Sequence, residues 1–387
     1  MKKRIVRLAS LLALISSLVS LTSCKLIFRP DGGVTDPPTP CEHQWNAWVY
    51  GLDPTCSEEG RRGRKCPKCN EFEYEAIPAT ENHYSRSWII DKEATCETDG
   101  EKHKVCDHCG AEFARRVIPA AHKFVNDACE HCAVSVDDFF IFTYSDYYGY
   151  YIFTGMTKDA AKTVTDIILP ATYRGAPVKV IDQKALYENL KIKSITVSEG
   201  YTTVREEAFS KCTNLTSAEL PDSITEMGNG IFKSCISLLS ANIPKPITKI
   251  PSFTFSSCTA LPNNSVYIHE DVTEIGDCAF ASCKGFTEIV IPDTVKILRT
   301  SAYSGCTNVK NVVVGRRVKR IERHVFDCGL SLTSVIMRDS EGWVLKAYYK
   351  DTGEPVDVPI KRSDLEMPFR AALYFKQTYV QYNWERN

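Results

Sequence analysis

The sequence predicts a repeat solenoid of short parallel β-strands and irregular turns, preceded by small modules rich in cysteine and histidine. An aromatic residue or leucine recurs every 23 residues through the second half, with one spacing of 25. A cysteine stands three residues after most of these positions, and two after the last. Repeats of 20 to 50 residues indicate stacked coils. The two series are Leu186, Phe209, Phe232, Phe255, Phe280, Tyr303 and Phe326, and Cys212, Cys235, Cys258, Cys283, Cys306 and Cys328.

Each repeat reads as one turn of the coil. Apolar residues alternate with others in pairs such as Ile195/Val197 and Ile289/Ile291, which predicts a short strand with one face inward. A second apolar set, such as Val272/Ile275, follows before the aromatic residue. One coil cannot bury these side chains alone, so neighbouring coils must supply the other wall. The alternating pairs are Ile195/Val197, Ala218/Leu220, Ala241/Ile243, Val266/Ile268, Ile289/Ile291, Val312/Val314 and Val335/Met337.

The recurring cysteines are expected to be free buried thiols that fill space in the core. Equivalent positions on successive coils lie about 5 Å apart, the strand spacing, and that distance alone would permit a disulfide. In-register neighbours point side by side, however, and Asn189 takes the same place in the first repeat. Cys278 stands outside this series.

The repeated motif resembles the BspA-type, or treponemal, leucine-rich repeat over about residues 140 to 387. The resemblance implies a leucine-rich repeat coil on a bacterial surface protein, with a role in adhesion and no catalytic residues. The matching segments are Cys212-Thr-Asn-Leu215, Ile289-Val-Ile-Pro292, Val272-Thr-Glu-Ile275 and Ala279-Phe-Ala-Ser-Cys283.

Both ends of a solenoid need caps, because an open coil exposes core and strand edges. The tyrosine-rich segment within 139–163 is the predicted N-terminal cap, and 339–387, where the period is lost, is the C-terminal cap. The aromatic residues of the second segment could also form a sugar platform, since tyrosine and tryptophan are favoured at contact surfaces.

The N-terminus has the layout of a secretory signal, with basic residues before an apolar run from Leu11 to Leu21. The run ends in Leu21-Thr-Ser-Cys24, which resembles a bacterial lipobox. The resemblance implies lipidation of Cys24 and anchoring to the membrane at the bacterial cell surface. The alternative is an ordinary signal and secretion. Residues 25–40 contain proline and glycine and predict a spacer.

A second repeat, with a period of about 40, lies between spacer and solenoid. Cys56, Cys66 and Cys69 recur as Cys96, Cys106 and Cys109, and a third pair follows in Cys129-Glu-His-Cys132. The modules resemble small cysteine/histidine repeats of Clostridia-type surface proteins. Units this small rarely bury a sufficient core and need a metal or a crosslink.

Two thiolates at Cys-x-x-Cys spacing, a third cysteine and a histidine can hold a tetrahedral zinc ion. We expect one structural site from Cys56, Cys66 and Cys69, and a second from Cys96, Cys106 and Cys109. Disulfides are the alternative, because exported proteins favour them. The histidine of each site stays open: His43 or His83 for the first, His83 or His122 for the second, with Cys41 and His131 as further candidates.

These observations predict a non-catalytic surface lipoprotein that binds a protein or glycan on a host, a neighbouring cell or the envelope. The formal net charge of -1 and the signal sequence argue against a nucleic-acid partner, and no motif of a nucleophile elbow, phosphate loop or zinc protease is present. Alternatives are a structural or metal-capturing envelope protein, or an accessory to polysaccharide degradation. The predicted segments are 1–23 signal peptide, 24–40 lipid-anchored spacer, 41–83 first module, 84–133 second module with a partial third, 139–163 cap, 164–338 solenoid and 339–387 cap.

Overall fold

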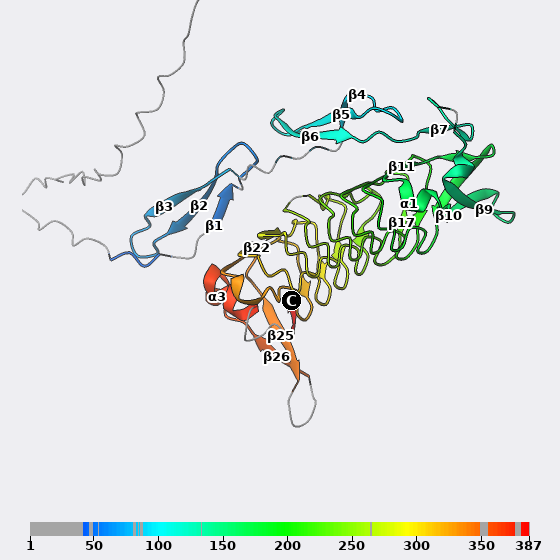
Figure 1. The fold of residues 1–387 in the computed structure, drawn as a ribbon. Helices are drawn as coiled ribbons and strands as arrows, with labels where there is room; N and C mark the ends of the chain where they lie inside the picture. Colours follow the sequence, from blue (N-terminus) through cyan, green and yellow to red (C-terminus); the bar gives the residue numbers. More distant parts are fainter. Residues whose placement is uncertain are drawn as a thin grey trace, which may run out of the picture.

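A computed structural model describes residues 42–45, 49–52, 54–79, 83, 85, 88–132, 134–263, 265–348, 355–375 and 381–386. The predicted signal peptide, the lipidation site Cys24, the spacer and Cys41 lie outside these ranges. Figure 1 shows a stack of coils between two caps, with small sheets beside it. The predicted class, a leucine-rich repeat solenoid, is confirmed.

One strand from each of six coils contributes to a parallel ladder, which is divided into two three-stranded sheets. Equivalent residues pair across one repeat, as Ile195 does with Ala218 and Val312 with Val335. The predicted inward residues of these strands are buried. The strands are β11 (Asp166–Leu169), β14 (Ser194–Val197) and β16 (Ser217–Glu219), then β20 (Glu288–Val290), β22 (Asn311–Val314) and β24 (Ser334–Met337).

The predicted strands at Ala241/Ile243 and Val266/Ile268 are wrong, although the first pair is buried. In the earlier of these two coils the Asn242 side chain bonds both the N–H and the C=O of Leu220, at 2.8 and 2.6 Å. A side chain thus replaces the backbone partner. The next coil contains the 25-residue spacing, and its two extra residues displace the backbone from ladder register.

The second apolar set of each coil forms a further parallel ladder of very short strands, which is interrupted once between Met227 and Lys249. Val204, for example, pairs with Met227, and Ile275 with Leu298. The members are β13 (Ala176–Ile181), β15 (Thr203–Val204) and β17 (Glu226–Met227), then β18 (Lys249–Ile250), β19 (Glu274–Ile275), β21 (Ile297–Leu298) and β23 (Arg320–Ile321); β12 (Thr172–Tyr173) pairs with β13.

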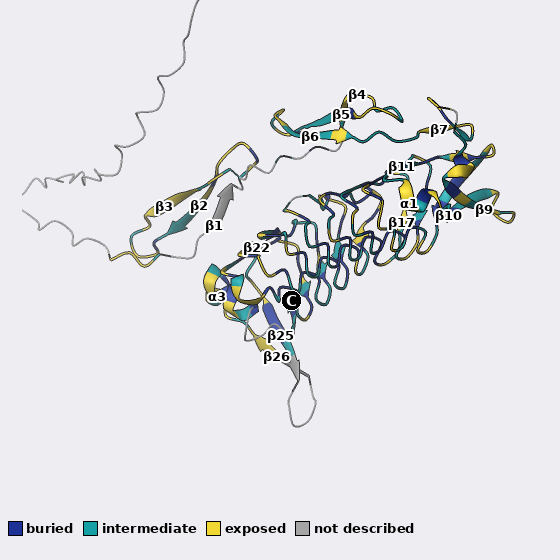
Figure 2. Cartoon of the chain, viewed as in Figure 1, coloured by how far each residue is buried: buried dark blue, intermediate teal, exposed yellow. Residues whose placement is uncertain are grey.

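The recurring aromatic side chains stack in the centre of the solenoid. Ring centroids of consecutive coils lie 5.5 Å apart for Phe209 and Phe232 and 5.1 Å apart for Phe280 and Tyr303. All members of the series are buried, and Figure 2 shows buried residues along the inside of the coils. A 23-residue period therefore places one large apolar side chain over the next throughout the stack.

The N-terminal cap is a hairpin of β9 (Phe140–Ser145) and β10 (Tyr150–Met156), followed by α1 (Ala160–Thr163). β10 extends the second ladder by pairing with β13, and β9 pairs antiparallel with β10. The hairpin thus occupies the ladder edge that the first coil would leave open.

The C-terminal cap closes the other end of the same ladder, because β27 pairs antiparallel with β23. Trp384 in β27 is buried and stacks on Phe375 at 4.1 Å, and Trp343 is buried beside it. Phe369 and Leu373 remain exposed. The elements of the cap are β25 (Trp343–Tyr348), β26 (Pro355–Pro359), α2 (Arg362–Leu365), α3 (Pro368–Leu373) and β27 (Asn383–Arg386), and η2 (Gly329–Ser331) belongs to the last coil.

Two antiparallel three-stranded sheets precede the solenoid, here named module 1 (β1–β3) and module 2 (β4–β6). A shorter hairpin, β7–β8, leads into the cap through η1. The bounds are β1 (Val49–Leu52), β2 (Gly60–Lys65), β3 (Phe72–Ile77), β4 (Ile89–Lys92), β5 (Gly100–Val105), β6 (Glu112–Ile118), β7 (Phe124–Val125), β8 (Ala128–Cys129) and η1 (Val136–Asp138).

Candidate metal centres and the outer sheet face

Cysteine and histidine side chains of the modules converge in three clusters. Within each, the sulfur and nitrogen atoms that could bind a metal all lie within 4.8 Å of one another. The clusters are cluster 1 (His43, Cys66, Cys69), cluster 2 (Cys56, His83, Cys106, Cys109) and cluster 3 (Cys96, His122, Cys129, Cys132).

A tight turn in each hairpin presents the Cys-x-x-Cys pair. Between β2 and β3, Cys66 N–H donates to the carbonyl of Glu71 at 2.8 Å, and Asn70 adopts a left-handed φ of 61°. The turn between β5 and β6 repeats this pattern, with Gly110 at a φ of 72°. Asn and Gly are the residues that tolerate this conformation best. The reversal brings both cysteine side chains of each pair to one cluster.

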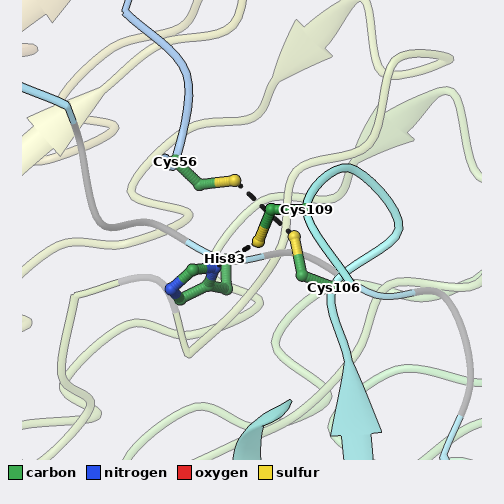
Figure 3. Close-up of side chains that lie close together, drawn as sticks. All are labelled: Cys56, His83, Cys106 and Cys109. Atoms are coloured by element: carbon green, nitrogen blue, oxygen red, sulfur yellow. Dashed lines mark hydrogen bonds between the residues drawn. The ribbon is translucent and has the colours of Figure 1, made fainter. Parts of the chain in front are cut away.

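Cluster 2 draws its ligands from both modules (Figure 3). Cys56, in the loop between β1 and β2 of module 1, places its sulfur 3.7 Å from that of Cys106 in module 2. The sulfur of Cys109 lies 3.3 Å from His83 Nδ1. The expected grouping of Cys56 with Cys66 and Cys69 is therefore wrong. The loop is directed toward the following hairpin rather than its own.

The same shift of one unit produces the other clusters. Cys96 of module 2 lies with Cys129 and Cys132, not with Cys106 and Cys109 as expected. His122 Nδ1 is 3.3 Å from the sulfur of Cys132. Cys129 and Cys132, the third Cys-x-x-Cys pair, complete this cluster. The pair was visible in the sequence but was not assigned to a site there.

Cluster 1 contains a histidine that the sequence left open. His43 Nδ1 lies 3.3 Å from the sulfur of Cys69, and Cys66 completes the described group. His83 and His122 then belong to clusters 2 and 3. His131 is exposed and belongs to none of the three groups found among the described residues.

The ionisation of the thiols differs among the clusters. Burial opposes ionisation of Cys66, but hydrogen bonds from His43 and from the N–H groups of Cys69 and Lys68 outweigh it and lower its pKa to about 6. Burial, followed by hydrogen bonds to Cys106 and Cys109, raises the pKa of Cys56 to about 11. Three sulfurs at one point repel each other's negative charge, and a bound divalent cation would remove that repulsion.

Three cysteines and one histidine, as in clusters 2 and 3, are a donor set that suits structural Zn²⁺. A disulfide could join only two of the three sulfurs and would leave the histidine without a role. The 3.7 Å between Cys56 and Cys106 is also far from a sulfur–sulfur bond of about 2 Å. The residues therefore fit a metal ion, which would hold the four ligands of each cluster in a tetrahedron.

The modules bury almost nothing else. Sheets with so little apolar core are not expected to be stable without a crosslink or metal. Among the described residues from 42 to 123, the buried ones are Cys56, Gly60, Cys66, Ser85, Gly100 and Cys106.

The cysteines of the solenoid have a different role. The recurring cysteines of the repeats are called ladder thiols below. Each donates to the carbonyl oxygen of the aromatic or leucine residue one coil earlier, as Cys212 does to Leu186 at 3.0 Å and Cys258 to Phe232 at 3.1 Å. Burial raises the pKa of Cys212 to about 12, so the thiol keeps the proton that it donates. Asn189 begins the series by accepting from the N–H of Lys191 and Ile192.

Each coil presents one outward residue at the position of the first ladder, and these residues are named here the outer row. After Ile168 come three polar residues, and the C-terminal half is apolar. Val290 pairs with Val313, and Val313 with Ile336; Tyr267 and Val290 are 40% and 41% exposed. The outer row consists of Ile168, Thr196, Glu219, Asn242, Tyr267, Val290, Val313 and Ile336.

Module 2 lies against this face. Lys102 forms an ion pair with Glu219 of the outer row, and the Arg116 guanidinium donates to Ser240 Oγ. A cleft is lined by Phe113 of module 2 together with Tyr267 and other solenoid residues. The cations next to the Trp88 ring are Lys102 at 4.8 Å, Lys104 at 5.1 Å and Arg116 at 5.2 Å from its centroid.

Comparison with known families agrees with the coil geometry. The BspA type Leucine rich repeat region matches in six copies, over residues 179–284 and 262–342. This part of the chain is a BspA-type leucine-rich repeat region. The match leaves both modules outside it, so their similarity to Clostridia-type repeats stays a prediction.

Several solved structures resemble the leucine-rich repeat solenoid. The T. pallidum leucine-rich repeat protein is 27% identical over 50% of this chain and 88% of its own, with a TM-score of 0.44. A leucine-rich cell surface protein from Faecalibacterium prausnitzii is 23% identical, covering 57% and 59%, with a TM-score of 0.46. One from Bacteroides ovatus is 23% identical, covering 52% of both chains, with a TM-score of 0.38. No curated protein matches the chain.

Within the described ranges, no helix is long and apolar enough to cross a bilayer.

Proposed function

We propose that this protein is a bacterial cell-surface lipoprotein whose leucine-rich repeat solenoid binds a protein partner through the outer row. The apolar half of that row carries the proposal, because Val290, Val313 and Ile336 form a stripe on the sheet of β20, β22 and β24, next to Tyr267 of the preceding coil. Exposed apolar stripes mark interaction sites, and solenoids bind through extended faces. Aliphatic side chains favour a protein over a glycan, which stacks better on aromatic rings.

The surface location rests on the N-terminal sequence and on the BspA-type repeats. A signal-like segment followed by Cys24 fits a lipid anchor, and the spacer would hold the modules away from the membrane. The proposal assigns no catalytic residue and no nucleic-acid partner.

Zinc is the proposed structural cofactor of the modules. Clusters 2 and 3 each offer three cysteines and one histidine, and the module sheets bury too little apolar surface to fold by packing. Metal analysis of the full chain, purified without chelator, is expected to find one zinc ion for each of the three clusters. Metal-free protein with oxidised thiols would refute the zinc and establish the disulfide alternative.

The binding face is tested with two matched apolar-to-acid substitutions in the full chain. Val290→Asp changes the outer row, whereas Leu330→Asp changes an 81% exposed residue in η2, outside the outer row. Binding of each variant to immobilised host extracellular proteins and to a glycan panel is compared with wild type. We expect Val290→Asp to weaken protein binding about tenfold or more, equivalent to about 1.4 kcal/mol, and Leu330→Asp to leave it unchanged. Binding to glycans alone, or equal effects of both substitutions, would contradict the proposal.

A further inference from the structure

Cluster 3 draws its ligands from two different parts of the chain. Cys96 belongs to module 2, in the loop between β4 and β5, while its partners His122, Cys129 and Cys132 belong to the segment before the N-terminal cap. A metal held by all four residues must therefore bridge module 2 and that segment.

The segment that carries these partners is fixed to the solenoid. The His122 ring lies 4.8 Å from that of Phe139, and the buried Phe124 packs edge-on against Phe140 at 5.7 Å. The Asp127 carboxylate accepts the N–H of Arg174 at 2.8 Å. Three of the four ligands of cluster 3 are thus part of the capped end of the solenoid.

Module 2 itself contacts the outer sheet face through a few polar side chains that are half-buried or buried. Its polar links to the coils include the pair of Lys102 and Glu219 and the bond from Arg116 to Ser240. An ion pair this far out of water adds little net stability, because desolvation of the two charges offsets most of their attraction. A metal in cluster 3 would close the loop between module 2 and the capped end of the solenoid. This tether raises the effective concentration of module 2 at the outer sheet face, which such weak contacts need.

We propose that a Zn²⁺ ion in cluster 3 clamps module 2 over the outer row at Glu219, so that loss of the metal frees module 2 and opens the cleft between Phe113 and Tyr267. The inference rests on the proposed zinc content and adds a function to it. Binding of the partner at the outer row and metal binding at cluster 3 then oppose each other, because module 2 and a partner would share the region around Glu219 and Tyr267.

Carbodiimide coupling of the full chain reports the clamp directly, because it joins an amine and a carboxylate already in contact. The peptides that contain Lys102 and Glu219 are quantified by mass spectrometry with metal bound and after chelation. Lys211 and Glu188, 2.8 Å apart within the solenoid, provide an internal control for its folding. Cys96→Ser removes the module 2 ligand of cluster 3, and Cys278→Ser is the matched control outside the clusters.

We expect the Lys102–Glu219 product to fall to background after chelation and in Cys96→Ser, while the Lys211–Glu188 product is unchanged. Cys278→Ser should behave as wild type. Metal release with an undiminished Lys102–Glu219 product overturns the clamp and leaves the zinc proposal intact. Absence of metal from the purified chain overturns the zinc proposal and the clamp together.

Discussion

The sulfur of Cys56 lies 3.7 Å from the sulfur of Cys106, fifty residues further along the chain. Cys56 belongs to module 1 and Cys106 to module 2, so consecutive units share a cluster instead of closing one each. Cys96 repeats the relationship with Cys129 and Cys132. A metal in either cluster would link neighbouring units as well as hold a hairpin.

This sharing predicts how many metal ions a double variant loses. Cys56 contributes to cluster 2 and Cys66 to cluster 1, so Cys56→Ser combined with Cys66→Ser should remove two zinc ions per chain. If each module closed its own site, both substitutions would affect one ion. Zinc measured by elemental mass spectrometry distinguishes the two arrangements.

A pair within one cluster is the matched control. Cys66→Ser with Cys69→Ser changes two ligands of cluster 1 and should cost one ion. Equal losses from the two double variants would contradict the shared arrangement.

The ladder thiols predict a loss of stability in alkali. Burial raises the pKa of Cys212 to about 12 from an ordinary value of 9.0. As pH rises, the Cys212 thiol ionises first in the unfolded chain. Its contribution to the free energy of unfolding is therefore fully present below pH 9 and decreases between pH 9 and 12. Each such thiol lowers the free energy of unfolding by about 1.4 kcal/mol per pH unit in that range.

Urea denaturation of the solenoid at pH 8, 9 and 10 measures this slope. Cys212→Ala is expected to be less stable at pH 8, because it loses a buried hydrogen bond to Leu186, but to show a shallower decline above pH 9. Identical slopes for variant and wild type would show that this thiol does not titrate on unfolding.

Trp384 is predicted to be the main apolar contact of the C-terminal cap. It is 1% exposed, stacks on Phe375 at 4.1 Å and belongs to the strand that pairs with β23. Trp384→Ala should lower the free energy of unfolding by about 3–5 kcal/mol, as expected for a large buried aromatic residue. Phe369→Ala, at a 58% exposed position of the same cap, should cost less than about 1 kcal/mol. Similar costs would favour a cap that packs through α3 instead.

Phe253 is predicted to be a strained position in the turns of the solenoid. Its φ is 60°, in the left-handed region that costs a non-glycine residue about 1–2 kcal/mol. Gly230 occupies the equivalent place one coil earlier, at a φ of 66°. Phe253→Asn should raise the free energy of unfolding by about 0.5–1 kcal/mol, because Asn tolerates this conformation. Phe253→Val should lower it, since β-branched residues fit the region poorly, and the same sign for both in chemical denaturation would contradict the strain.

Much of the solenoid was predictable because each contact is made with the equivalent residue one period away. Phe209 stacks on Phe232, and Cys235 donates to the carbonyl of Phe209, so the 23-residue spacing is enough to place them. The break in the first ladder was not predictable, because it depends on Asn242 taking the backbone partners of Leu220. A side chain that takes the place of backbone hydrogen-bond partners leaves the apolar pattern of the coil unchanged.

The sequence by itself determined that the protein is a solenoid preceded by cysteine/histidine modules, because period and residue type specify both. Only the tertiary structure decided that Cys56 joins Cys106 and that module 2 lies against Glu219. The modules are near copies, so a loop cysteine has the same local sequence whether it completes its own hairpin or the next. The direction of that loop in space, set by how successive sheets pack and where the chain rejoins the solenoid, makes the choice.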